Sequence, residues 1–177
     1  MKTKVIFKKL LSSHQNESFT NYLPLNNALV SDIGKAVTAI FDELGGASLL
    51  KSSGEVFIKP NAVDAKAYSH TRIEVLREII LYWKKAGAKK IYLFENSTQA
   101  NYTRLVYSAT GYARLCRETG AKPIYLDEEK SRPLPFTGRG PVGIKDPDGY
   151  DLTSFEMPET VMRLIVERIR YLYIIVP

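Results

Sequence analysis

Residues 54–71 read GEVFIKPNAVDAKAYSHT, and the rest of the chain is organised around this stretch. Its apolar run, Val56 to Ile58, leads directly into Lys59-Pro60-Asn61 and then into a loop that ends where a helix begins. A short, unbroken apolar run is typical of a strand that is buried on both faces of a parallel sheet. Because ligands of open α/β sheets bind outside the carboxyl ends of the strands, the stretch predicts both a fold class and the position of a site.

Strand-like and helix-like segments alternate along the chain. Short apolar runs predict strands at 4–10, 55–59, 91–94, 123–126 and 171–176. Apolar residues three and four positions apart predict helices at 28–44, 71–87 and 102–118, the last interrupted near Gly111. They also predict a final helix with Pro158 in its first turn, which buries Val161, Leu164, Ile165 and Ile169. This alternation predicts an α/β fold: an open, mainly parallel sheet of about five strands with helices on both faces, in Rossmann-like layers.

The length and composition indicate a single α/β domain that spans residues 1–177. No apolar run approaches the ~20 residues of a membrane span and no signal peptide is recognisable, so we expect a cytoplasmic protein with no membrane contact. Residues 128–151 are rich in proline, glycine and charge, which predicts a surface excursion. The chain stops one residue after the last predicted strand, which leads us to expect a truncated C-terminus.

The formal net charge of +6 favours acidic ligands through the long-range field. The basic residues form short pairs and no nucleic-acid recognition motif accompanies them, so nucleic acid is not an expected partner. The single cysteine, Cys116, lies on the apolar side of a predicted helix and is expected in the core. One cysteine cannot form an internal disulfide or hold an iron–sulfur cluster within this chain.

Two further motifs lack the context that their chemistry needs. Gly138–Gly143 matches the dinucleotide pattern G-x-G-x-x-G, but no credible strand precedes it and no helix follows it. Asp146, Asp148 and Asp151 lack the full spacing of a calcium loop and its bidentate glutamate. We therefore predict no metal site from the sequence.

Polar side chains follow two of the predicted strands. Lys59 and Asn61 follow one strand, and Glu95 and Ser97 follow the next. If these strands are neighbours, their carboxyl ends meet at one edge of the sheet and the four side chains reach the same cleft. Each residue also has an ordinary structural explanation, as an exposed strand end or a polar turn. Asp127, after a later strand, is a weaker candidate of the same kind.

His70 and Thr71 complete the candidate ligand-binding set at the start of the following helix. Thr71-Arg72-Ile73-Glu74 matches a capping box, in which the threonine and the glutamate satisfy each other's backbone amides. The helix N-terminus beside Thr71 is also suited to bind an anion. His70 could contact a ligand, transfer a proton or donate a hydrogen bond to a loop carbonyl.

Several linked motifs resemble the family called domain of unknown function 362. They are GEVFIKPN at 54–61, HTRIEVLREII at 70–80, KKAGAKKIYLFENS at 84–97 and TGYARLCRETGAKPIYLDEE at 110–129, with a weaker likeness in YLYIIVP at 171–177. The resemblance implies an α/β domain but no particular activity. Some members of the family are associated with iron–sulfur clusters through an accompanying cysteine region, which this sequence lacks.

Our first hypothesis is an α/β domain that binds an anionic or polar small ligand at its strand carboxyl ends, as part of an enzyme. Lys59 would neutralise the anion and Asn61 would orient it. The helix at Thr71 would add backbone amides, while Glu95 and Ser97 would close the site. The alternative is a non-catalytic scaffold or an electron-transfer partner module. The sequence identifies neither a reaction nor a cofactor.

Overall fold

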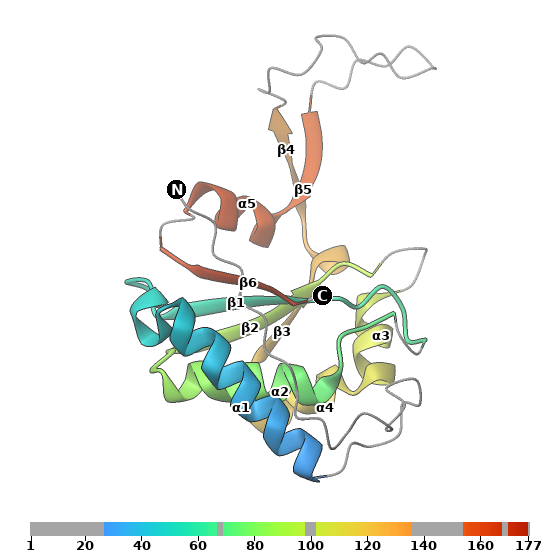
Figure 1. Ribbon diagram of the computed structural model, residues 1–177. Coiled ribbons are helices and arrows are strands. Elements are labelled where there is room, and N and C mark those ends of the chain that lie inside the picture. Colours follow the sequence, from blue (N-terminus) through green and yellow to red (C-terminus); the bar gives the residue numbers. More distant parts are fainter. Residues whose placement is uncertain (1–26, 67–68, 98–101, 136–153, 168–169, 177) are drawn as a thin grey trace, which may run out of the picture.

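The structure is a computed structural model that describes residues 27–66, 69–97, 102–135, 154–167 and 170–176 (Figure 1). In these residues, four strands form a parallel sheet in the order β3-β2-β1-β6. Their bounds are β1 Glu55–Pro60, β2 Lys90–Glu95, β3 Lys122–Tyr125 and β6 Leu172–Val176. A separate antiparallel pair consists of β4 (Ser131–Pro135) and β5 (Ser154–Pro158). The predicted α/β class with a mainly parallel sheet is confirmed.

The strand β1 is buried on both faces, as its unbroken apolar run predicts, and it lies in the interior of this sheet. It pairs with β2 on one side and with β6 on the other. Val56, Phe57 and Ile58 are all fully buried. Successive strand side chains point to opposite faces, so consecutive apolar residues are needed only where both faces are covered.

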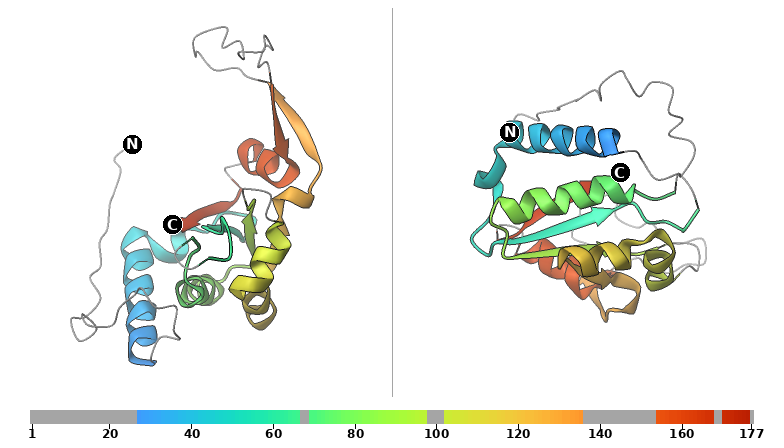
Figure 2. Two further views of the ribbon diagram at one scale, coloured as in Figure 1. Left: turned by 90° about the vertical axis from the view of Figure 1, so that its right-hand side faces the viewer. Right: turned by 90° about the horizontal axis from the view of Figure 1, so that it is seen from below.

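The helices α1 (Asn27–Leu44), α2 (Ile73–Lys85) and α4 (Tyr112–Thr119) cover one face of the sheet (Figures 1 and 2). Leu76 and Ile80 of α2 belong to the same core cluster as Val56 and Ile58. This spacing of α2 follows the predicted helical periodicity, because residues four positions apart share one helix face.

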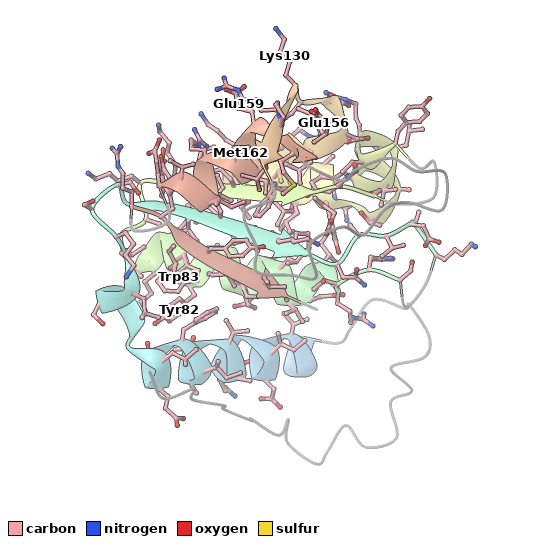
Figure 3. All side chains as sticks on the ribbon, turned by 90° about the horizontal axis from the view of Figure 1, so that it is seen from above. Tyr82, Trp83, Lys130, Glu156, Glu159 and Met162 are labelled. Atoms are coloured by element: carbon pink, nitrogen blue, oxygen red, sulfur yellow. The ribbon has the colours of Figure 1, made fainter. Side chains whose placement is uncertain are left out.

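The helix α1 packs against α2 through aromatic side chains. The Phe41 ring lies 5.0 Å from that of Tyr82 and 5.1 Å from that of Trp83, measured between centroids. Figure 3 shows Tyr82 and Trp83 on the side of the sheet that faces α1. Through these aromatic contacts, α1 and α2 share one core on the same face of the sheet.

The helix α5 (Glu159–Val166) covers the opposite face (Figure 2). A second core cluster lies there, with Val161 and Leu164 packed against Phe57, Phe94, Leu126 and Tyr171. Helices on both faces are thus confirmed. The predicted burial of Ile165 is wrong, since this side chain is 46% exposed.

A glycine separates α3 (Thr103–Thr110) from α4, as predicted. Gly111 has a φ of 84°, in the left-handed region that glycine adopts without a steric penalty. The break turns the chain so that both short helices reach the core, where Cys116 is buried as expected.

The order in which strands are added to the sheet reverses at β1. The chain leaves β1 through α2 on one face to reach β2, whereas β6 follows α5 on the other face and pairs with the opposite side of β1. Ligands of open α/β sheets bind at the carboxyl ends of the strands, at such a point where the order of strands reverses.

Several predictions concern residues outside those that the structure describes. They are the strand at 4–10, the glycine motif at 138–143, the three aspartates between 146 and 151, most of the excursion at 128–151, and the burial of Ile169. The first residues of that excursion lead into β4. Among the helices of the described ranges, none has the length and apolar character needed to cross a membrane.

Candidate functional site

An ion pair between two predicted site residues joins the carboxyl ends of β1 and β2. Lys59 Nζ lies 2.5 Å from Glu95 Oε2, and the other carboxylate oxygen accepts the backbone N–H of Asn96 at 2.9 Å. The Glu95 side chain is 7% exposed, whereas that of Lys59 is 35% exposed. Because an ammonium has three donors, Lys59 can hold Glu95 and still donate to a molecule at the surface. The predicted adjacency of the two strands is confirmed by their register.

Thr71 joins β6 to the loop that follows β1. Its hydroxyl donates to the Val176 carbonyl at 3.0 Å and accepts the backbone N–H of Asn61 at 2.9 Å. The predicted capping box is wrong: α2 begins at Ile73 with Arg72 at the N-cap position, and within the described chain it has no side-chain cap bond. The Thr71 hydroxyl is engaged elsewhere because the end of β6 brings it a buried carbonyl that needs a donor.

The loop between β1 and α2 is held by its own hydrogen bonds. Asn61 Nδ2 donates to the Ser69 carbonyl at 3.2 Å, and Ala62 forms a bridge with His70. His70 Nδ1 lies 3.0 Å from the Lys66 carbonyl oxygen, so this nitrogen carries the proton and donates. Burial lowers the pKa of His70, which keeps the imidazole neutral at pH 7. Donation to a loop carbonyl, one of the three roles predicted for His70, is therefore observed.

Ser97 connects the loops after β1 and β2. Its hydroxyl donates to the Ala62 carbonyl at 2.7 Å, and its backbone N–H donates to Thr103 Oγ1 at 2.9 Å. Asp127 Oδ2 in turn accepts the Thr103 N–H at 3.0 Å. Asp127 thus satisfies an amide at the start of α3, which gives this weaker candidate a structural role.

Tyr112 is a buried residue of this region that the candidate set omits. Its hydroxyl donates to the Thr71 carbonyl and lies 3.3 Å from the Asn61 carbonyl, while its ring meets that of His70 edge-on at 6.1 Å. The available signal was the tyrosine of TGYARL at 110–115, which helical periodicity alone interprets as a core residue.

The structure brings all six predicted residues to the carboxyl edge of the sheet, but they differ in what they contact. Asn61, Thr71 and Ser97 direct polar atoms to backbone groups of the domain. Lys59 instead contacts the buried carboxylate of Glu95, and its side chain is partly exposed at the surface. In the described part of the chain, no group of three His, Cys, Asp or Glu side chains is placed to hold a metal ion.

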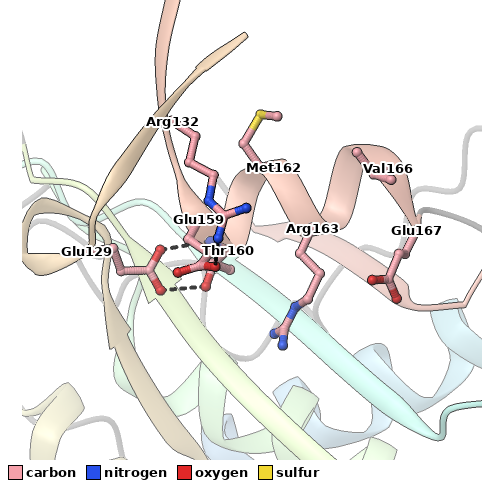
Figure 4. Close-up of a pocket in the computed structure, with 8 residues that line it drawn as sticks. All are labelled: Glu129, Arg132, Glu159, Thr160, Met162, Arg163, Val166 and Glu167. Carbon is pink, nitrogen blue, oxygen red and sulfur yellow. Dashed lines mark hydrogen bonds and ion pairs between the residues drawn. The ribbon is translucent and has the colours of Figure 1, made fainter.

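A cavity of about 490 Å³ lies elsewhere, between β4 and α5 (Figure 4). Its polar groups largely satisfy one another. Glu129 accepts the N–H and the hydroxyl of Thr160 at 2.9 and 2.6 Å, and Arg132 pairs with Glu159 at 2.7 Å. None of the six predicted residues lines this cavity, and its contacts hold α5 to the β4 side of the domain.

The fold and the polar strand ends define the class of this protein: an α/β domain with a charged pair at the carboxyl edge of a parallel sheet. It belongs to the family described as Domain of unknown function (DUF362), whose sequence model matches residues 56–147. The match includes all six candidate residues and confirms the family resemblance of the sequence motifs. Comparisons with curated proteins and with solved structures gave no match.

Proposed function

We propose that this domain binds an anionic or polar small ligand at the carboxyl ends of β1 and β2, as part of an enzyme. The observation that supports the proposal is the Lys59–Glu95 pair, in which a buried carboxylate holds a partly exposed ammonium beside the reversal of strand order. An ammonium fixed in this way loses little conformational freedom when a ligand binds, which favours affinity.

Glu95 also limits how strongly the site attracts an anion. Two unit charges 4 Å apart interact by about 4 kcal/mol at the effective dielectric of a protein surface. A ligand anion on Lys59 is therefore repelled by the carboxylate behind it. The pair selects ligands with a weak or single negative charge, and Glu95 is the residue whose neutralisation should strengthen binding.

The first test is a thermal-shift screen of the full chain with inorganic phosphate, nucleotides, small carboxylates and metal ions. A ligand at a hundredfold its dissociation constant stabilises the folded state by ~2.7 kcal/mol. The screen is repeated on Glu95→Gln, which keeps the shape of the side chain and an acceptor oxygen for Lys59. For an anionic hit, affinity should rise about tenfold, which corresponds to about 1.4 kcal/mol.

Two further variants make the test specific. Lys59→Gln/Glu95→Gln removes both charges without leaving a buried carboxylate unpaired, and binding should be lost. Lys90→Gln, at the other end of the same strands, removes one positive charge from the domain and should leave affinity within about twofold of wild type. Binding that survives in the double variant contradicts the proposed site.

The alternative function, a scaffold or electron-transfer partner module, is favoured by a different observation. The side chains of Asn61, Thr71 and Ser97 donate their hydrogen bonds to backbone carbonyls of the domain, as expected of residues with a purely structural role. No stabilisation by any compound of the screen, with Glu95→Gln behaving as wild type, supports this alternative. The cytoplasmic location expected from the sequence stays a prediction.

A further inference from the structure

An apolar cavity lies on the face of the sheet that α5 covers. Its volume is about 350 Å³, and it is lined by Phe94, Val161, Leu164, Ile165, Tyr171 and Tyr173. The rings of Phe94 and Tyr173 form part of its floor, with centroids 5.7 Å apart. Its volume is at the lower end of the range of small-molecule pockets, which are mostly apolar with a few polar groups.

Strand register places Lys59 at the edge of this cavity. Ile58 pairs with Leu93, so the next residues, Lys59 and Phe94, are neighbours on adjacent strands. Lys59 also shares a face with Phe57, two positions earlier, which packs against Phe94 in the cluster beneath α5. Two strand residues span about 6.6 Å, so one small molecule can reach from the cavity to the ammonium.

Tyr173 supplies a polar group to the wall of this cavity. Partial burial and the nearby Glu95 carboxylate both raise the pKa of Tyr173, which keeps the phenol protonated. The cavity wall therefore carries a hydroxyl donor next to its aromatic surface. A dianion such as phosphate would bring two negative charges close to Glu95, whereas a carboxylate brings one.

From this geometry we propose that the cavity beneath α5 and Lys59 form one binding site for a small carboxylic acid with an aromatic or branched apolar body. The carboxylate binds Lys59, and the body lies against Phe94 and Tyr173, where offset or edge-on ring contacts are favourable. The inference rests on the proposed function, which supplies the anion-binding role of Lys59, and it adds the ligand class.

The test compares 3-phenylpropanoate with propanoate, which share the carboxylate, and with neutral 3-phenylpropanamide, by calorimetry on the full chain. Burial of the ring should make 3-phenylpropanoate bind about tenfold or more tightly than propanoate. The amide should bind about tenfold more weakly than the acid, since it loses the charge-assisted contact with Lys59.

Leu164→Trp fills the cavity and should remove the advantage of the ring while leaving propanoate affinity unchanged. Ile165→Trp offers the same test at a partly exposed position if the first variant does not fold. Val166→Trp is the matched control, because Val166 is on the same helix, is exposed and does not line this cavity.

Equal affinity for the two acids in the wild type, or an unchanged ring advantage in a folded cavity variant, overturns the ligand class. The proposed function still stands in that case if Glu95→Gln strengthens the binding of the acids. If neither acid binds and Glu95→Gln binds no anion, both proposals fall.

Discussion

The two ends of β1 carry the same chemistry in different surroundings. At the amino end, Glu55 of β1 pairs with Lys90 of β2 at 3.3 Å; at the carboxyl end, Lys59 of β1 pairs with Glu95 of β2 at 2.5 Å. The exposed fractions are 15% and 53% for the first glutamate and lysine, against 7% and 35% for the second pair. The pair at the carboxyl end is the more deeply buried one.

A hydroxyl group links β1 to β6 at each end of these two strands, and the two links also differ in burial. At the amino end, Ser53 Oγ donates to the Arg170 carbonyl at 2.5 Å and accepts the N–H of Glu55 at 3.1 Å. At the carboxyl end, Thr71 makes the corresponding bonds to Val176 and Asn61. Ser53 belongs to a short turn at the surface, whereas Thr71 is buried.

The difference follows from how parallel strands are connected. The chain enters β2 and β3 through short turns after α2 and α4, and it leaves β1 and β2 toward the next helices, α2 and α3. Among the described residues at the carboxyl ends of β1 and β2, the polar side chains of Thr71, Glu95 and Ser97 are buried. Identical residue pairs should therefore contribute more to stability at the carboxyl edge than at the amino edge.

The largest expected effect is on the two ion pairs. Lys59→Met leaves the Glu95 carboxylate buried without its cation and should lower the free energy of unfolding by about 2 kcal/mol, less than a fully buried pair because Lys59 is partly exposed. Lys90→Met should lower it by less than about 1 kcal/mol. Urea unfolding measures both values.

Lys59→Met/Glu95→Leu is the control for this comparison. It removes both charges and should recover most of the lost stability, because no buried carboxylate is left unpaired at position 95. Equal losses in the two single variants would show that the ends of β1 do not differ in the way that their burial implies.

The next effect concerns the two hydroxyl bridges. Thr71→Val keeps the shape of the side chain but leaves the buried Val176 carbonyl without one donor, which should lower the free energy of unfolding by about 1–2 kcal/mol. Ser53→Ala should lower it by about 0.5 kcal/mol, because water reaches the exposed Arg170 carbonyl. Thermal unfolding monitored by circular dichroism compares the variants, and a larger loss for Ser53→Ala would reverse the proposed order.

The smallest expected effect is the pH dependence of folding stability that His70, at the carboxyl edge, contributes. Burial lowers the pKa of His70 in the folded state below its ordinary value of 6.5, so below pH 6.5 the unfolded chain binds the proton more readily. Folding stability should therefore be fully present above about pH 6.5 and should decrease as the pH falls from 6.5 toward the pKa of His70 in the folded state.

His70→Gln should remove this part of the pH dependence, with stability measured by urea unfolding at pH 5 and pH 7.5. Lys90→Met serves as the control, because it changes only the amino end of β1, keeps His70 and should retain the wild-type pH profile. A profile that is the same with and without His70 would assign the pH dependence to other groups.

Local patterns in the sequence predicted much of this fold. The run Val56–Ile58 predicted a strand covered on both faces, and Gly111 predicted the break between α3 and α4. Both features depend on neighbouring residues only: a strand alternates its faces and a glycine relaxes its own φ. The edge of the sheet that holds the candidate site was predictable for the same reason, since strand direction follows from the order of strands and helices.

The contacts within that edge were not predictable from local patterns. Thr71 matched a capping box, yet its hydroxyl bonds a carbonyl 105 residues away. Ile165 matched a buried helix position, yet it borders a cavity because α5 does not fill the space above Phe94 and Tyr173. For Thr71 the competing partner comes from β6, and no local pattern contains the place of β6 in the sheet.

By itself, the sequence determined the alternation of strands and helices, the burial of β1 on both faces and the edge where polar side chains gather, because these depend on periodicity and chain order. Only the tertiary structure decided that Lys59 is held by Glu95, that Thr71 serves β6 instead of α2, and that an apolar cavity lies on the face that α5 covers. Those features depend on which distant segments meet, and on how much water their meeting excludes.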